Sequence, residues 1–378
     1  NCLPGTHFLV LLSPKTSTRM AFPLRLLGLA CLVLLWLSSP SFGLSADENN
    51  SIRDMIEQWP ILLQYGWQND SSLACSQETK WRFIGCNSDE HVTSLVIENI
   101  PLNGHIPPSI SRLNYLNKLT LSRTSLTGGI PHSMGDLLSL SSLVLSRNQL
   151  TGQIPESLGN LNALSLLSLD YNNFNATIPS SLGNLRSLDQ LYLESAGLIG
   201  TIPDELGSLS LLLVLYLDNN QLNGTIPSTL VELSSLAILS MKNNLLQGTI
   251  PLSLLELPAL ASLALSNNSL TGGWPDHPIG SPLNELFVDS NSLSLCPALQ
   301  LRDAGHLDSC NITVQAIPSC GCHSDWVKTW CVPSAQTSFL PDCAPPPVTA
   351  PQSADSAQIS TSCLAIFAFV ANLAWLVL

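Results

Sequence analysis

The side chains best suited to metal chemistry lie close together near the C-terminal end of the chain. Cys320, Cys322 and His323 are near neighbours, and Cys331 follows shortly after them. Thiolate and imidazole groups are the ligands that Zn²⁺ prefers, so these residues could form a zinc site. The competing interpretation is oxidation to disulfides, which cysteines undergo in exported proteins. We expect disulfides here, and neither a metal nor another cofactor.

No combination of residues typical of catalysis accompanies this cluster. The sequence has no H-E-x-x-H zinc motif, no G-x-S-x-G nucleophile motif and no phosphate-binding G-x-x-x-x-G-K-[ST] loop. The net charge of −13 disfavours a nucleic-acid partner, because phosphate binding needs clustered basic residues. We therefore predict that the protein is not an enzyme and does not bind nucleic acid.

The N-terminal region has the pattern of an export signal, which starts at Met20, the first methionine. Arg25 precedes an apolar run over residues 26–37, and small residues lead to a cleavage position after Gly43. The alternative is an N-terminal membrane anchor, for which this apolar run is short. We interpret residues 20–43 as a signal peptide and residues 1–19 as non-native upstream sequence.

The C-terminal region has the pattern of a lipid-anchor signal. A linker rich in Pro and Ser spans residues 344–358, and an apolar tail follows over residues 359–378. Small residues followed by a polar spacer and an apolar tail direct attachment of a glycosylphosphatidylinositol (GPI) anchor, and we expect attachment at Ala354, Asp355 or Ser356. A transmembrane tail is the alternative interpretation.

Export would change the net charge of the chain and the modifications expected on it. Removal of Lys15, Arg19 and Arg25 with the leader leaves 11 basic and 27 acidic residues, a net charge of −16. The even number of remaining cysteines predicts disulfides among Cys75, Cys86, Cys296, Cys310, Cys320, Cys322, Cys331 and Cys343. Asn-x-Ser/Thr sequons predict N-glycosylation at Asn49, Asn69, Asn175, Asn223, Asn267 and Asn311.

The middle of the chain repeats itself every 24 residues. An Ile-Pro pair recurs at this interval from Ile106-Pro107 to Ile250-Pro251, and an alternating apolar pair that begins with Leu95 and Ile97 keeps the same interval. The alternation predicts strands with one buried face. Because no single unit can bury its own leucines, the units must stack into a solenoid.

An asparagine follows most of the predicted strands, at the corner where the chain turns. We expect the stacked amides to pair with backbone groups that the turn leaves unpaired. These residues are Asn148, Asn172, Asn220, Asn244, Asn268 and Asn291. Ile100, Thr124 and Ala196 occupy the equivalent positions of other repeats, and we expect loosely held corners there.

The repeat L-x-x-L-x-L-x-x-N-x-L-x-G-x-I-P-x-x-L-G-x-L resembles the plant-type extracellular leucine-rich repeat, which residues 143–164 match almost position by position. The resemblance implies an α/β-type solenoid, a curved right-handed superhelix with a parallel β-sheet on its concave face. Trp67, Cys75, Trp81 and Cys86 resemble the N-terminal cap of that family. We expect an N-terminal cap over 44–94, about nine repeats of 24 residues over 95–295 and a Cys-rich C-terminal cap over 296–343.

The side chains that flank the buried pair of each strand are expected to face solvent on the concave surface. This arrangement stacks Tyr192 on Tyr216 and places a column of acids beside them. Exposed tyrosines are enriched at binding hot spots, and neighbouring acids favour a basic ligand. The alternative is that tyrosine simply suits a strand and the acids aid solubility. The predicted ligand-binding residues are Tyr171, Tyr192, Tyr216, Asp170, Glu194 and Asp218.

Together these features predict a non-catalytic recognition protein at the outer face of the plasma membrane or in the cell wall. Its partner would be an extracellular peptide, protein or glycan, and the family resemblance adds a receptor kinase as a second partner. Two alternative functions come from protein classes that resemble this chain in repeat type. They are a defence protein that inhibits polygalacturonase, and a receptor-like protein with a transmembrane tail that acts as a co-receptor. A structural wall protein is a further alternative.

Overall fold

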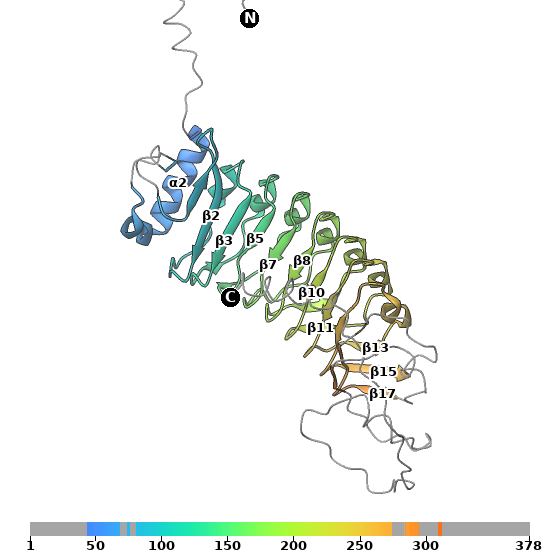
Figure 1. The fold of residues 1–378 in the computed structure, drawn as a ribbon. Coiled ribbons are helices and arrows are strands. Elements are labelled where there is room, and N and C mark those ends of the chain that lie inside the picture. Colours follow the sequence, from blue (N-terminus) through green and yellow to red (C-terminus); the bar gives the residue numbers. More distant parts are fainter. Residues whose placement is uncertain are drawn as a thin grey trace, which may run out of the picture.

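A computed structural model describes residues 44–68, 74–75, 81–273, 283, 285–294 and 309–311. These residues form a curved solenoid, which runs from an N-terminal cap through successive stacked repeats (Figure 1). The predicted signal peptide, the GPI attachment residues and the C-terminal tail lie outside the described residues. So do the cysteines of the predicted C-terminal cap apart from Cys310. None of the helices within the described ranges is long and apolar enough to cross a membrane.

The N-terminal cap is a helix that packs on the first repeat. Helix α2 (Ala46–Gln58) begins at Ser45, whose side chain accepts a hydrogen bond from the backbone N–H of Glu48 and so caps the helix end. The 3₁₀ helix η1 (Pro60–Tyr65) follows directly. The indole N–H of Trp59 donates to the carbonyl of His105 at 3.1 Å, and a disulfide joins Cys75 to Cys86. The cap therefore closes the open end of the stacked leucines.

An eleven-stranded sheet lines one side of the solenoid. Its strands in spatial order are β1 (Ile84–Cys86), β2 (Val92–Glu98), β3 (Lys118–Ser122), β5 (Ser142–Val144), β7 (Leu166–Ser168), β8 (Gln190–Tyr192), β10 (Val214–Tyr216), β12 (Ile238–Ser240), β14 (Ser262–Ala264), β16 (Glu285–Phe287) and β18 (Ser309–Asn311). Only β1 runs antiparallel to its neighbour, β2. Strand β18 extends the sheet into the segment predicted as the C-terminal cap.

The register of the sheet follows the 24-residue repeat. Leu191 of β8 lies opposite Leu215 of β10, and Tyr192 lies opposite Tyr216. Because each repeat places the same position at the same height, equivalent side chains form columns across the sheet. The apolar pair of each repeat is buried, as predicted, and Leu191, Leu193, Leu215 and Leu217 have no exposed surface.

Short 3₁₀ helices cover the opposite side of the solenoid. They are η3 (Pro108–Arg112), η4 (His132–Asp136), η5 (Glu156–Asn160), η6 (Ser180–Asn184), η7 (Asp204–Ser208), η8 (Ser228–Glu232) and η9 (Leu252–Glu256). Glycine is needed in η4 to η7, each of which packs closely on the next helix. A Cβ on Gly159 would lie 2.3 Å from the carbonyl oxygen of Ser181 in the next repeat.

Between the large sheet and the 3₁₀ helices runs a strip of short parallel strands. It consists of the pair β4 (Thr127–Gly128) and β6 (Gln149–Leu150), the pair β9 (Ile199–Thr201) and β11 (Gln221–Asn223), and the triplet β13 (Gln247–Thr249), β15 (Ser269–Gly273) and β17 (Ser292–Ser294). We use the term lateral face for the surface built by residues 149–153, 173–177, 197–201, 221–225, 245–249 and 269–273.

The asparagine ladder is confirmed at the corner between the two sheets. The amide of Asn220 donates to the carbonyls of Leu193, Leu217 and Asp218 at 2.8, 3.0 and 3.1 Å. Its oxygen accepts from the N–H groups of Ala196 and Leu198 at 3.1 and 2.9 Å.

The expectation of loosely held corners at Thr124 and Ala196 is wrong. The N–H of Thr124 donates to the side chain of Asn148 at 3.0 Å, in the same way that the N–H of Ala196 donates to Asn220. The asparagine of the following repeat therefore serves a corner that lacks one of its own.

Candidate ligand-binding site on the concave face

Tyr192 and Tyr216 form the centre of the candidate site. Their ring centroids lie 5.7 Å apart and the ring planes differ by 14°, so the rings stack across strands β8 and β10. Both rings are half-buried. The Tyr192 hydroxyl donates to the side-chain oxygen of Gln190 at 3.1 Å. The in-register pairing of the two strands produces the stack that the sequence predicts.

The expectation that all flanking side chains face solvent is wrong for the small ones. Ser168 and Ser240, which lie on either side of the tyrosine pair in the same column, are both only 2% exposed. Neighbouring strands are about 4.8 Å apart, so a large side chain readily covers a small one on the next strand. On the concave surface, aromatic and charged side chains therefore face solvent, and the small side chains between them are covered.

Asp218 is less available to a ligand than the sequence suggested. Its carboxylate accepts from the Ser240 hydroxyl at 2.6 and 2.8 Å and from the backbone N–H of Lys242 at 2.6 Å. The residue is 7% exposed, and burial raises its pKa. Asp170 is similar, because it accepts from the hydroxyl of Ser168 and burial raises its pKa. Both carboxylates are bound to hydroxyl groups of their own sheet.

Glu194 lies between these two acids and is the carboxylate best placed to meet a ligand. Burial raises its pKa, and the charges of Asp170 and Asp218 raise it further. A hydrogen bond with Tyr171 opposes this shift. Glu194 is half-exposed, unlike Asp218. The predicted acidic column therefore consists of Glu194 between two carboxylates, Asp170 and Asp218, that are bound to serine hydroxyl groups.

Two basic residues that sequence reasoning left out of the site flank the acids. The Arg147 guanidinium lies 4.2 Å from the centroid of the Tyr171 ring, and Tyr171 itself is 38% exposed. The Lys242 ammonium lies 5.9 Å from the centroid of the Phe287 ring. No carboxylate among the described residues lies within 4 Å of either cation. Arg147 precedes Tyr171 by 24 residues and Lys242 follows Asp218 by 24, so the repeat interval could have identified both.

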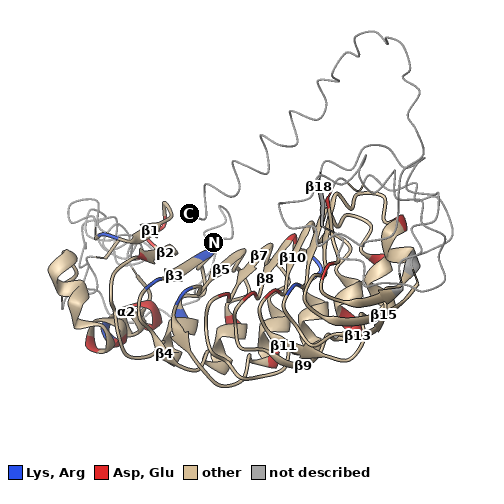
Figure 2. Ribbon diagram, turned by 90° about the horizontal axis from the view of Figure 1, so that it is seen from below, with Lys and Arg blue, Asp and Glu red and all other residues tan. Residues whose placement is uncertain are grey.

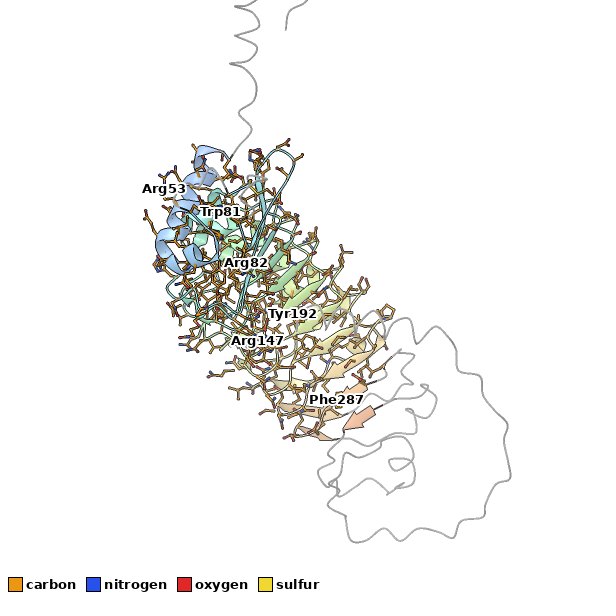
Figure 3. The ribbon with its side chains drawn as sticks, turned by 60° about the vertical axis from the view of Figure 1, so that its left-hand side comes forward. Arg53, Trp81, Arg82, Arg147, Tyr192 and Phe287 are labelled. Carbon is orange, nitrogen blue, oxygen red and sulfur yellow. A yellow bond between two sulfur atoms is a disulfide. The ribbon has the colours of Figure 1, made fainter. Side chains whose placement is uncertain are left out.

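The site as a whole is zwitterionic rather than simply acidic. Figure 2 shows basic and acidic residues along the same sheet, and Figure 3 places Tyr192 and Phe287 on it, with Arg147 to one side of its strands. Burial raises the pKa of Tyr192 to about 12, and Tyr216 and Glu194 act in the same direction. The phenols therefore stay protonated near neutral pH. Within the described ranges no group of His, Cys, Asp and Glu side chains could hold a metal ion.

Comparison with known proteins identifies the repeat. The family model of the Leucine Rich Repeat matches residues 139–161, 163–185 and 211–233. The ectodomain of the Arabidopsis thaliana receptor kinase GASSHO1/SCHENGEN3, in complex with CASPARIAN STRIP INTEGRITY FACTOR 2, is 32% identical with a TM-score of 0.55. The alignment covers 65% of this chain and 33% of that one. A search of characterised protein sequences found no match.

Two further solved structures match part of the chain. A plant ice-binding protein is 27% identical with a TM-score of 0.52, and the alignment covers 65% of this chain and 87% of that protein. The plant peptide hormone receptor RGFR1, in complex with RGF2, is 32% identical with a TM-score of 0.47, over 53% of this chain and 36% of that one. The chain spans about a third of the length of the receptor ectodomains that it matches.

Proposed function

We propose that this chain, a leucine-rich-repeat protein of the plant extracellular type, is a non-catalytic recognition protein that binds a peptide on its concave face. The observation that carries the proposal is the stacked pair Tyr192 and Tyr216 beside the half-exposed carboxylate of Glu194. Stacked rings offer a large contact area at low entropic cost, and a nearby carboxylate selects a basic group. The complex of the similar GASSHO1/SCHENGEN3 ectodomain with CASPARIAN STRIP INTEGRITY FACTOR 2 supports a ligand-binding role.

The proposal includes a position at the cell surface and a signalling partner. A GPI anchor attached at Ala354, Asp355 or Ser356 would hold the protein at the outer face of the plasma membrane. A receptor kinase would then relay the signal. Treatment of intact cells with phosphatidylinositol-specific phospholipase tests the anchor. Release of the protein supports the lipid, and retention in the membrane fraction supports a transmembrane tail.

Binding to a synthetic peptide library tests the site itself. The full chain is expressed through the secretory pathway and immobilised, and random peptides are selected on it. We expect the double substitution Tyr192→Ala with Tyr216→Ala to weaken binding of the selected peptides at least about tenfold, the scale of a hot-spot loss. The matched control is Thr201→Ala on the lateral face, since Thr201 is exposed and belongs to no sequon. Equal binding by wild type and double variant would rule out the concave site.

The lateral face favours a second candidate function, which is binding to ice. Its residues include no charged side chain, although the chain carries a net charge of −13. Thr177, Thr201, Thr225 and Thr249 form an exposed row at one residue per repeat. An uncharged row with a regular spacing suits a repetitive surface. The plant ice-binding protein, of which the alignment covers 87%, supports this candidate.

Inhibition of ice recrystallisation distinguishes the two candidates. Thr201→Lys with Thr249→Lys would abolish the inhibition if the lateral face binds ice, and Tyr192→Ala would leave it unchanged. The sequons at Asn175 and Asn223 lie on this same face, so the assay is run before and after enzymatic removal of N-glycans. Protein that shows no inhibition in either form does not bind ice.

A further inference from the structure

A second aromatic and basic cluster lies on the concave face, three strands from Tyr216. The middle position of the sheet holds Ser240 on β12, Ala264 on β14 and Phe287 on β16. Ser240 and Ala264 are only 2% and 4% exposed, whereas Phe287 is half-exposed. Phe287 lies further along the sheet than Tyr192 (Figure 3). Two strands of small residues therefore separate the tyrosine pair from the next ring.

Lys242 adds an unpaired positive charge to this cluster. Its ammonium lies 5.9 Å from the Phe287 ring centroid. The two nearest acids of its column are bound elsewhere, since Asp218 accepts from the Ser240 hydroxyl and the Lys242 backbone N–H, and Asp289 accepts from the hydroxyl of Ser266. No ion pair forms between Lys242 and any carboxylate of the described residues. The Asp218 charge interacts with Lys242 at longer range, but the ammonium donates to no carboxylate of the described residues and is therefore suited to bind an external one.

We propose that Lys242 and Phe287 form a second anchor, which binds an acidic side chain of the same peptide whose basic side chain lies at Tyr192, Tyr216 and Glu194. This inference rests on the proposed peptide-binding function. Glu194 and Lys242 belong to repeats two steps apart, which is about 10 Å at the strand spacing. An extended peptide covers that distance in about three residues. The ligand class is therefore an extended peptide with a basic and an acidic residue three or four positions apart.

The charge pattern of library-selected peptides tests this inference. The probe is a library of random peptides with acetylated N-termini and amidated C-termini, so that only side chains supply carboxylates. The full chain is compared with Lys242→Glu, and with Lys118→Glu as the matched control, since Lys118 is an exposed lysine on strand β3 of the same sheet. We expect wild type and the control to enrich peptides with an acid three or four positions from a base.

Charge reversal gives the decisive comparison. Lys242→Glu is expected to bind the wild-type peptides about tenfold more weakly and to prefer a base at the acidic position. Unchanged selection by Lys242→Glu, with binding still lost in Tyr192→Ala with Tyr216→Ala, overturns the second anchor but leaves the concave site in place. Selection unaffected by any of these substitutions overturns both. Thermal unfolding of each variant shows whether lost binding reflects lost folding.

Discussion

The concave face and the lateral face come from the same 24-residue repeat but differ in how far their side chains vary. On the concave face the equivalent positions change from Ser168 to Tyr192 and from Asp218 to Lys242. On the lateral face Thr177, Thr201, Thr225 and Thr249 repeat over four successive repeats, and Gln153 and Gly273 take the same position at the two ends of the row. Buried positions are constrained by stacking, whereas exposed positions are free to differ. A surface of varied side chains suits one particular ligand, whereas a surface of repeated side chains suits a ligand that is itself repetitive, such as ice.

The repeat also explains how charges remain unpaired on the concave face. The repeat brings Asp218 and Lys242 to equivalent positions just after the adjacent strands β10 and β12, yet the carboxylate of Asp218 binds a hydroxyl and a backbone N–H. The lateral face has no charges to pair. The difference between the faces can be tested by substitutions that act on both of them, on the corner between them, or on one alone.

A cavity in the shared core has the largest expected effect, because it removes support from both faces. Leu191 has no exposed surface and lies beneath the tyrosine pair in strand β8. We expect Leu191→Ala to lower the free energy of unfolding by about 3 to 4 kcal/mol, from lost burial and an unfilled cavity. Urea denaturation followed by circular dichroism measures the change. Leu211→Ala is the control, because Leu211 is 53% exposed and its loss should be nearly neutral.

Removal of one asparagine of the ladder should destabilise the corner that joins the two faces. Asn220 follows strand β10 and precedes β11, and its side chain makes five hydrogen bonds to backbone groups. We expect Asn220→Ala to cost about 2 kcal/mol, because several of these groups stay unpaired.

The adjacent Asn219 provides the matched control. It is exposed and has a positive φ of 56°, so Asn219→Gly removes a side chain without backbone strain. If urea midpoints fall equally for Asn220→Ala and Asn219→Gly, the buried ladder does not stabilise the corner. Hydrogen exchange at Ala196 and Leu198, whose N–H groups bond to Asn220, gives a local measure of the same effect.

The sequence predicts those features that depend on the repeat interval alone. The interval determines which positions share a column, and this is sufficient for the buried leucines, the asparagine ladder and the stack of Tyr192 on Tyr216. It does not determine which way a side chain turns within its column. The hydrogen bonds of Asp218 to Ser240 and the placement of Arg147 over Tyr171 depend on side-chain rotamers and on neighbouring strands.

A glycine on the lateral face should have a moderate effect confined to that face. Gly224 has a φ of 75°, and a Cβ there would lie 2.9 Å from the γ-methyl carbon of Thr201. We expect Gly224→Ala to cost about 1 to 2 kcal/mol, from backbone strain and displacement of the threonine. Gly152→Ala is the control, because Gly152 has a φ of 80° but no atom within 4 Å of its Cβ position. Equal urea midpoints for the two variants would mean that contact with the threonine row contributes nothing.

The smallest expected effect is the pH dependence of stability from Glu194, which is confined to the concave face. Its folded-state pKa is raised by burial and by the neighbouring acids, so the folded protein binds the proton more tightly than the unfolded chain does. The resulting stabilisation is present below the unfolded pKa of about 4.3 and is lost as pH rises through the folded value. Glu194→Gln should reduce this loss between pH 4 and pH 7, by less than about 1 kcal/mol because the side chain is partly screened by solvent.

Urea midpoints at the two pH values measure the effect of Glu194→Gln, with Glu205→Gln on the exposed 3₁₀ side as control. A loss that is the same in wild type and in Glu194→Gln would mean that Glu194 carries no electrostatic strain in the folded protein. The two faces would then differ in shape, but the charges of the concave face would add no pH-dependent term to the free energy of unfolding.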